Sequence, residues 1–267
     1  MPRFPVLRHT AAAVLTCACA GLAQAEGWPA GRIVDMSWPY NAETIYWPTE
    51  KGFEKSTRFE GMTDKGYYYS AYSVKTAEHG GTHLDAPIHF AAGRHTTDQV
   101  PLEQLMGPAV VVDVSAKARG NNDYLVSVAD IEAWEKQHGA IPAGAIVLLR
   151  TGHGPLWPDR EAYLGTAALG EAAVPLLHFP GLAPDAATLL ESRAVDAVGI
   201  DTASIDYGQS QDFMAHRILL GANIPVFENV ANLEQLPATG ALVIALPMKI
   251  EGGSGAPLRI AGIIPAP

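Results

Sequence analysis

Cysteine is nearly absent from this chain of 267 residues. The only two, Cys17 and Cys19, lie in an apolar stretch near the N-terminus, where Cys17 matches a lipidation site only weakly. The rest of the chain therefore has no thiol for a disulfide, for a thiolate metal ligand or for a cysteine nucleophile. Any metal ligands beyond this stretch must come from histidines and carboxylates.

Basic residues are also few and scattered. The chain has 18 Lys and Arg against 28 Asp and Glu, a net charge of −10, and no cluster of basic residues anywhere. A protein that binds nucleic acid needs a basic face to contact the phosphates. The composition therefore argues against a nucleic-acid partner.

The apolar stretch at residues 11–22 is short for a transmembrane helix, which needs about 20 residues. It follows Arg3 and Arg8 and precedes Ala-Gln-Ala at 23–25, the small-x-small pattern of a signal-peptide cleavage site. We therefore expect residues 1–25 to be a signal peptide, and the mature protein to be periplasmic or secreted with no membrane contact. An uncleaved anchor is the alternative. Cleavage would leave 16 basic and 28 acidic residues, a net charge of −12.

Linkers, internal repeats and low-complexity segments are missing from residues 26–267, which we therefore expect to form a single domain. With 48% hydrophobic residues in the chain, it is large enough for a sizeable core. Short apolar runs of buried-strand type alternate with helical patterns, without strict βαβ regularity. This mixture predicts a layered α/β architecture with a mixed sheet. The expected strands are 33–37, 67–74, 110–114, 145–150, 197–201, 224–227 and 241–246, and the expected helices are 127–137, 184–193 and 213–220.

Several familiar catalytic motifs are incomplete in this sequence. Around Ser254 the spacing of a nucleophile elbow is broken at Ala256. The segment 152–154, Gly-His-Gly, lacks the third glycine of a dinucleotide-binding loop, and no P-loop is present. Asp201 and Ser204 lie near the end of an expected strand but do not define a catalytic triad.

The sequence does contain a dense group of potential metal ligands. His79, His83, Asp85 and His89 fall within eleven residues, and imidazole and carboxylate groups suit Zn²⁺, Mn²⁺ or Fe²⁺. The glycine pair 80–81 argues against a helix and predicts a tight turn that leads into a short extended segment. Because side chains alternate along a strand, His83 and Asp85 would share one face, with His79 folded back toward them and His89 near the mouth. A polar surface loop is the alternative.

Two residues in the second half of the chain extend this group. Glu228 follows the apolar segment 224–227, and a buried carboxylate usually becomes neutral or finds a cation. That cation is either a metal ion or a basic group such as Arg217. His216 alone, on an expected helix, is compatible with a ligand or with a packed structural residue.

Aromatic residues are concentrated in the proline-rich loop 38–48. The residues that interest us are Trp38, Tyr46 and Trp47. Aromatic loops of this kind serve equally well to pack a core and to hold a flat ligand. We therefore expect these three rings either to contact an aromatic substrate or to pack inside the protein.

The segment 79–90, His-Gly-Gly-Thr-His-Leu-Asp-Ala-Pro-Ile-His-Phe, resembles the signature of the cyclase superfamily of metal hydrolases. That group includes bacterial kynurenine formamidase and isatin hydrolase. The resemblance extends over nearly the whole mature chain, and residues 199–210 and 245–250 look more like the isatin-hydrolase branch. It implies a swivelling β/β/α fold and a homodimer or a larger homo-oligomer.

The resemblance also implies roles for individual residues. His89 matches a proton donor and acceptor, and Trp47 matches an aromatic side chain that contacts the substrate. In members with two metal ions, Asp85 bridges them. The implied cofactor is one or two divalent ions, Mn²⁺ or Zn²⁺. The implied ligands are His79, His83 and Asp85 for the first ion, completed by His216 and Glu228 for the second.

Three functions are compatible with this sequence. The first is a metal-dependent hydrolase that opens a cyclic aromatic amide, such as isatin to isatinate, by attack of a metal-bound water with His89 as proton shuttle. The second is an arylformamidase that releases formate from N-formylkynurenine. The third is an exported metal-dependent binding protein without turnover. An open metal site beside a free histidine favours hydrolysis.

Overall fold

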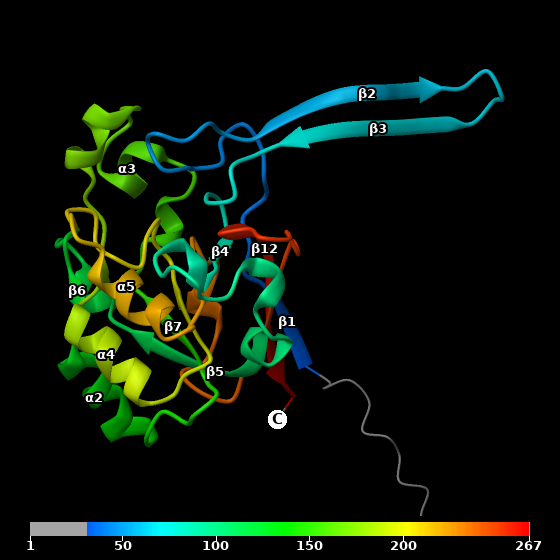
Figure 1. Ribbon diagram of the computed structural model, residues 1–267. Coiled ribbons are helices and arrows are strands. Elements are labelled where there is room, and N and C mark those ends of the chain that lie inside the picture. The colour runs from blue at the N-terminus through cyan, green and yellow to red at the C-terminus, as the bar shows by residue number, and fades with distance from the viewer. Residues whose placement is uncertain (1–30, 267) are drawn as a thin grey trace, which may run out of the picture.

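The computed structural model describes residues 31–266 (Figure 1), so the predicted signal peptide at 1–25 lies outside the described residues. The described residues form a mixed α/β body, as the sequence predicts. No helix within 31–266 combines the length and the apolar character that a membrane span requires.

The central sheet is mixed and closes on itself. Its order is β1-β12-β11-β5-β7-β9-β10-β4, and β4 pairs back with β12. Strands β5, β7, β9 and β10 run parallel, and the other pairs are antiparallel. The closure into a barrel is not visible in the sequence. The strands are β1 (Gly31–Asp35), β2 (Glu54–Met62), β3 (Tyr68–Lys75), β4 (His83–Asp85), β5 (Met106–Asp113), β6 (Leu125–Val126), β7 (Ile146–Arg150), β8 (Gly181–Leu182), β9 (Ala197–Ile200), β10 (Val226–Glu228), β11 (Leu242–Pro247) and β12 (Gly255–Pro265).

Helices cover one face of this sheet (Figure 1). Ser127 and Asp130 form the capping box that starts α2, and Gly139, with a φ of 94°, ends it. The α-helices are α1 (Ser115–Ala118), α2 (Val128–His138), α3 (Arg160–Leu164), α4 (Pro184–Ser192) and α5 (Met214–Gly221). The short 3₁₀ helices are η1 (Pro87–His89), η2 (Thr97–Gln99), η3 (Leu102–Leu105), η4 (Gly154–Leu156), η5 (Glu171–Leu176) and η6 (Leu233–Gln235).

Two cores share the central strands. Val147 and Leu149 pack with α2, α4 and α5, whereas Ile146 and Leu148 pack with Phe227 on the other side of the sheet. Alternate residues of one strand therefore enter different cores. This double burial explains why these strands are continuous apolar runs in the sequence.

Strand β4 carries two of the predicted ligands and lies between β10 and β12. Glu228 pairs with His83, and Val226 pairs with Asp85, in an antiparallel register. Leu84, between the two ligands, enters the core on the opposite face. The predicted alternation is therefore confirmed, and His83 and Asp85 share one face of the sheet.

The glycine turn before β4 is tightly enclosed by tyrosines. Gly80 and Gly81 have φ values of 147° and 58°. A Cβ on Gly80 would lie 2.1 Å from Cδ1 of Tyr46, and one on Gly81 would lie 2.8 Å from Cζ of Tyr40. Both the backbone conformation and the close rings thus require glycine. The turn brings His79 next to β4.

Strands β2 and β3 form a hairpin, which we call the arm (residues 54–75), that extends away from the body (Figure 1). Because the predicted strand at 67–74 runs directly into the His79 cluster, the sequence leads us to expect the ligands at the end of a rigid strand. The structure corrects this: β3 has mainly exposed side chains on both faces and belongs to the arm. The support comes from β4, whose three residues are all buried.

Candidate metal centre

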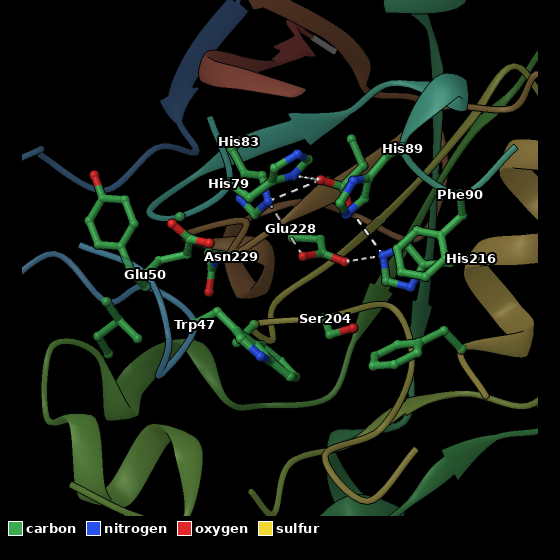
Figure 2. Close-up of a pocket in the computed structure, with 16 residues that line it drawn as sticks. Trp47, Glu50, His79, His83, His89, Phe90, Ser204, His216, Glu228 and Asn229 are labelled. Atoms are coloured by element: carbon green, nitrogen blue, oxygen red, sulfur yellow. Dashed lines mark hydrogen bonds and ion pairs between the residues drawn. The ribbon is translucent and has the colours of Figure 1, made fainter. Parts of the chain in front are cut away.

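A cavity of about 250 Å³ opens beside β4 and β10 (Figure 2). It is bordered by the loop before the arm, the glycine turn, η1 and the start of α5. All five predicted metal ligands line it, so the structure brings together residues from both halves of the chain. Its lining is Ile45, Tyr46, Trp47, Glu50, His79, Gly80, His83, Asp85, His89, Phe90, Ala203, Ser204, Phe213, His216, Glu228 and Asn229.

Asp85 lies at the centre of the five. Its Oδ1 is 2.6 Å from Nδ1 of His79 and 3.1 Å from Nε2 of His83. Its Oδ2 is 3.1 Å from Nε2 of His216. Glu228 spans two of the same histidines, at 3.5 Å from Nε2 of His83 and 3.2 Å from Nε2 of His216 (Figure 2). Three imidazoles and two carboxylates thus converge.

The outward nitrogens of two histidines are held by acceptors. Nδ1 of His83 donates to the carbonyl oxygen of Gly81 at 3.0 Å. Nδ1 of His216 donates to a carboxylate oxygen of Asp206 at 2.7 Å. In each ring the other nitrogen, Nε2, then presents a lone pair to the cluster. Such outward hydrogen bonds orient histidines that bind metal ions.

This set of groups fits a divalent cation. The lone pairs on Nε2 of His83 and His216 face carboxylate oxygens, and two acceptors cannot hydrogen-bond without a proton or a cation between them. Asp85 and Glu228 are buried, and none of the described residues lining the cavity is Lys or Arg. Nitrogen and oxygen groups without thiolates suit Zn²⁺ or Mn²⁺. The alternative of a salt bridge from Glu228 to Arg217 is not what the structure shows.

The shifted pKa values of the residues in the cluster also favour a positive charge there. Burial lowers the pKa of His83, but Asp85 and then Glu228 raise it to about 9 overall. Burial also lowers the pKa of His216, and its carboxylate partners raise it well above its usual value. Burial raises the pKa of Asp85, and the histidines bring it well below its usual value. Burial and then Asp85 raise the pKa of Glu228.

His89 lies on η1 at the mouth of the cavity, as the sequence predicts. Its ring stacks on His79 with 3.9 Å between the ring centres and meets the edge of Phe90 at 4.6 Å. Covering the ring in this way lowers the pKa of His89 to about 4, with Asp85 acting in the opposite direction. Within residues 31–266 its ring nitrogens have no hydrogen-bond partner, so they are free to meet a ligand.

The predicted aromatic residues have different positions. Trp47 lines the cavity. Tyr46 lines it too, but it is buried, with its hydroxyl oxygen 2.6 Å from Oγ1 of Thr76, so it acts as a fixed wall. Trp38 lies outside the cavity and stacks on Trp157 at 5.4 Å. Of the two alternatives that the sequence left open, the position of Trp38 fits packing inside the protein, and its main-chain N–H donates to Thr82 at 2.9 Å.

Sequence reasoning missed several residues of the site. Phe90 stacks on His216 at 4.5 Å, and Phe213 lies 5.4 Å from Phe90. The side chain of Asn229 donates to the carbonyl of Gly81 at 2.7 Å and ties the glycine turn to the end of β10. Asp206 also accepts from the main-chain N–H of His216. Only Phe90 had a signal, its place in the motif directly after His89.

Known proteins resemble this chain over most of its length. The family model described as "Putative cyclase" matches residues 34–207. Isatin hydrolase of Roseibium aggregatum is 36% identical over 208 residues, which cover 75% of this chain and 77% of the relative. Kynurenine formamidase of Salinibacter ruber is 31% identical over 227 residues, which cover 85% of this chain and 95% of the relative.

The three-dimensional structure is similar as well. The crystal structure of an isatin hydrolase bound to the product analogue thioisatinate matches with a TM-score of 0.78 and 30% identity. The match covers 88% of this chain and 92% of that one. The resemblance in structure therefore covers most of the described fold.

Proposed function

Because the chain belongs to the Putative cyclase family, we propose that it is a metal-dependent hydrolase that opens a cyclic aromatic amide such as isatin. The observation that carries this proposal is the convergence of three histidines and two buried carboxylates in a cavity with aromatic walls. Relatives named isatin hydrolase support the choice of amide.

We propose that the five converging residues bind one or two divalent ions. His79, His83 and Asp85 would hold the first divalent ion, and Asp85 would share a second with His216 and Glu228. Among the described residues, two groups of three side chains have ligand atoms within 4.8 Å of one another, His79/Asp85/His89 and His83/Asp85/Glu228, and Asp85 belongs to both. A divalent ion in such a site lowers the pKa of a coordinated water and polarises a carbonyl group. We propose Mn²⁺ or Zn²⁺, because the groups are imidazoles and carboxylates.

His89 is the residue placed to move a proton. Hydrolysis adds the oxygen of water to the amide carbon, breaks the C–N bond and leaves one proton of that water on the nitrogen. Neutral imidazole can accept this proton and deliver it to the departing nitrogen. His89 faces the cavity, has no competing partner among the described residues and lies next to His79. In a cyclic amide, the acid and the amine remain in one molecule.

The cavity suits one small flat molecule. Trp47, Phe90 and Phe213 provide apolar ring surfaces in its lining, and the rings of Phe90 and Phe213 lie next to each other. Its volume of about 250 Å³ lies just below the usual range for ligand pockets. Aromatic surfaces of this kind bind a planar ring and exclude water from the reacting carbonyl.

The two candidate substrates differ in charged groups. N-formylkynurenine carries a carboxylate and an ammonium group on one carbon away from the amide, whereas isatin carries neither. The described lining contains no Lys or Arg to pair with the carboxylate, and Glu50, beside Trp47, offers a partner for the ammonium group (Figure 2). The relatives named isatin hydrolase support placing a neutral cyclic amide first and N-formylkynurenine second.

The arm supports a homodimer or a larger homo-oligomer. A two-stranded hairpin is only marginally stable alone in water. This one exposes Phe59, Met62, Tyr68 and Tyr69, each more than 40% accessible. Exposed apolar groups on a projecting hairpin are typical of a contact surface. We propose that the arm packs against a second copy of this chain.

The cellular location rests on the sequence alone. The pattern at residues 1–25 is that of a signal peptide. We propose that it is cleaved and that residues 26–267 act in the periplasm or outside the cell. Mass spectrometry of the mature N-terminus tests this: a chain that retains its first 25 residues in the cytoplasm would contradict it.

One experiment tests the proposed reaction and its alternatives together. The purified protein is analysed for bound metals and then assayed with isatin and N-formylkynurenine at equal concentrations. We expect bound Mn²⁺ or Zn²⁺, faster turnover of isatin, loss of activity after chelation and recovery when the ion is restored. Full activity in metal-free protein would rule out the proposal. Bound metal and bound ligand without product would identify a binding protein.

A further inference from the structure

His79 differs from His83 and His216 in the hydrogen-bond partner of the ring nitrogen that points away from the cluster. Nε2 of His79 lies 2.9 Å from the hydroxyl oxygen of Ser254, which precedes β12. His83 and His216 use a carbonyl and a carboxylate for the same purpose. A hydroxyl can donate or accept, so its direction must be set by a further group.

Glu78 sets that direction. Its Oε2 lies 2.7 Å from Oγ of Ser254, 2.8 Å from the main-chain nitrogen of Ser254 and 3.2 Å from that of Gly255. A carboxylate only accepts, so the single hydroxyl proton of Ser254 points to Glu78. The hydroxyl oxygen therefore accepts from His79, whose Nε2 carries the proton. Nδ1 of His79 then presents a lone pair toward Asp85, 2.6 Å away.

This arrangement excludes Ser254 as a nucleophile. Ser254, His79 and Asp85 follow one another in the order of a Ser-His-Asp triad. In a triad, however, the serine donates to the histidine, which acts as base. Here the proton of the serine points to Glu78, and Ser254 is not part of the cavity lining.

The backbone after Ser254 also packs against the imidazole. A Cβ on Gly255 would lie 2.5 Å from Cε1 of His79. The ring therefore lies directly on this glycine, and its orientation depends on the position of the loop. Glu78 fixes that loop through its contacts with the main chain of Ser254 and Gly255.

We propose that Glu78 and Ser254 are positioning residues that fix the tautomer and the orientation of His79 for cation binding. This inference rests on the proposed metal-dependent function. Hydrogen-bond partners of this type change metal affinity by about 10- to 100-fold when they are removed. Ser254→Ala should therefore weaken cation binding by that factor, whereas Ser254→Thr, which keeps the hydroxyl, should retain the wild-type affinity within about threefold.

Cation affinity is the measurement, independent of turnover. The dissociation constants of full-length wild type, Ser254→Ala, Ser254→Thr and Glu78→Ala for Zn²⁺ and Mn²⁺ are compared by competition with a chelator. Ser192→Ala, on the distant helix α4, is the matched control. Thermal unfolding of the metal-free proteins shows whether each variant folds. The double variant Glu78→Ala/Ser254→Ala should bind the cation as tightly as the single variant with the lower affinity. The two losses should not add, because both residues act through His79.

A spectroscopic measurement on the wild type needs no variant. Nitrogen-15 NMR of the Zn²⁺-loaded protein should show His79 protonated at Nε2. Protonation at Nδ1, or unchanged affinity in a folded Ser254→Ala, would overturn the inference and leave the proposed function intact. A wild type that binds neither ion would overturn both. If the losses of cation affinity in the two single variants added fully in the double variant, Glu78 would not act on His79 through Ser254.

Discussion

His83 and Glu228 are direct neighbours on antiparallel strands, and Nε2 of His83 lies 3.5 Å from Oε2 of Glu228. Main-chain hydrogen bonds between β4 and β10 therefore set the separation of two predicted ligands. Sites built on strands are held more precisely than sites built on flexible loops. The remaining ligands attach to this pair through the glycine turn and through α5.

Replacing His89 by alanine should stop turnover without removing the cation. His89 contributes a movable proton, and loss of such a group lowers kcat by about 10²- to 10⁴-fold. It is not one of the five converging ligands, so metal content should change little. Steady-state kinetics and elemental analysis of the same sample check this. A His89→Ala variant with wild-type kcat would show that another group moves the proton.

Replacing Glu50 by glutamine should change substrate preference. One negative charge at the cavity wall attracts the ammonium group of N-formylkynurenine by roughly 1 kcal/mol, or about fivefold in kcat/KM. Glu50→Gln should therefore lower kcat/KM for N-formylkynurenine by about that factor and leave isatin nearly unchanged. The loss should shrink at high salt, since ions screen exposed charges.

Glu43→Gln is the matched control for Glu50, because Glu43 is an exposed acid of the same loop that does not line the cavity. Equal effects from both variants would indicate a general effect of net charge. No effect on either substrate would show that Glu50 takes no part in selection.

Polar substitutions on the arm should dissociate the proposed homo-oligomer. Phe59 and Tyr69 lie on one face of the hairpin, with 5.8 Å between their ring centres. Exchanging both for serine removes the largest apolar surface on that face. Light scattering after size-exclusion chromatography should then report a smaller species than for wild type. Leu169→Ser, at an exposed apolar residue outside the arm, should leave the mass unchanged.

Asp130 should make the stability of the fold depend on pH. Burial raises its pKa, but hydrogen bonds from Lys117, Ser127 and Tyr124 bring it below the usual value. A carboxylate with a lowered pKa stabilises the folded state above its unfolded pKa of about 3.9. That contribution disappears as the pH falls through the folded pKa.

Asp130→Asn should accordingly cost roughly 1–3 kcal/mol of unfolding free energy at pH 7, since Asp130 accepts from several groups at the start of α2. At pH 2 the variant and the wild type should differ much less. Urea unfolding at both pH values measures the difference. Asp64→Asn, at an exposed residue between the two strands of the arm, provides the control, and an equal cost at pH 2 would contradict the ionic origin.

The sequence identifies the central strands and helices because their patterns are strong. The runs predicted at 110–114, 145–150 and 197–201 are apolar except for one charged residue at or near the end of each, since the central residues of these strands are buried on both faces. Strand β12 escaped prediction because Pro257 and Gly262 interrupt its pattern. Strand β2 escaped it because its residues are nearly all exposed and give no hydrophobic period.

In the site, the residues of one short motif could be predicted, and residues that only the fold brings near could not. His79, His83 and Asp85 could be predicted from the sequence because one short motif contains all three. For His216 and Glu228 the residues alone left a ligand or a structural role open, and the resemblance to a family favoured the ligand. Residues that support them from afar, such as Asp206 and Ser254, have no local signature, since only the closed sheet and the packing of α5 bring them near the histidines.

Closure of the barrel by β12 makes the cluster depend on two distant parts of the chain. Strand β4 pairs with β12, and Ser254 directly before β12 lies 2.9 Å from His79. The histidine motif around residue 80 therefore needs residues around 255 for its final arrangement. A fragment that ends before β12 could not assemble the cluster by itself.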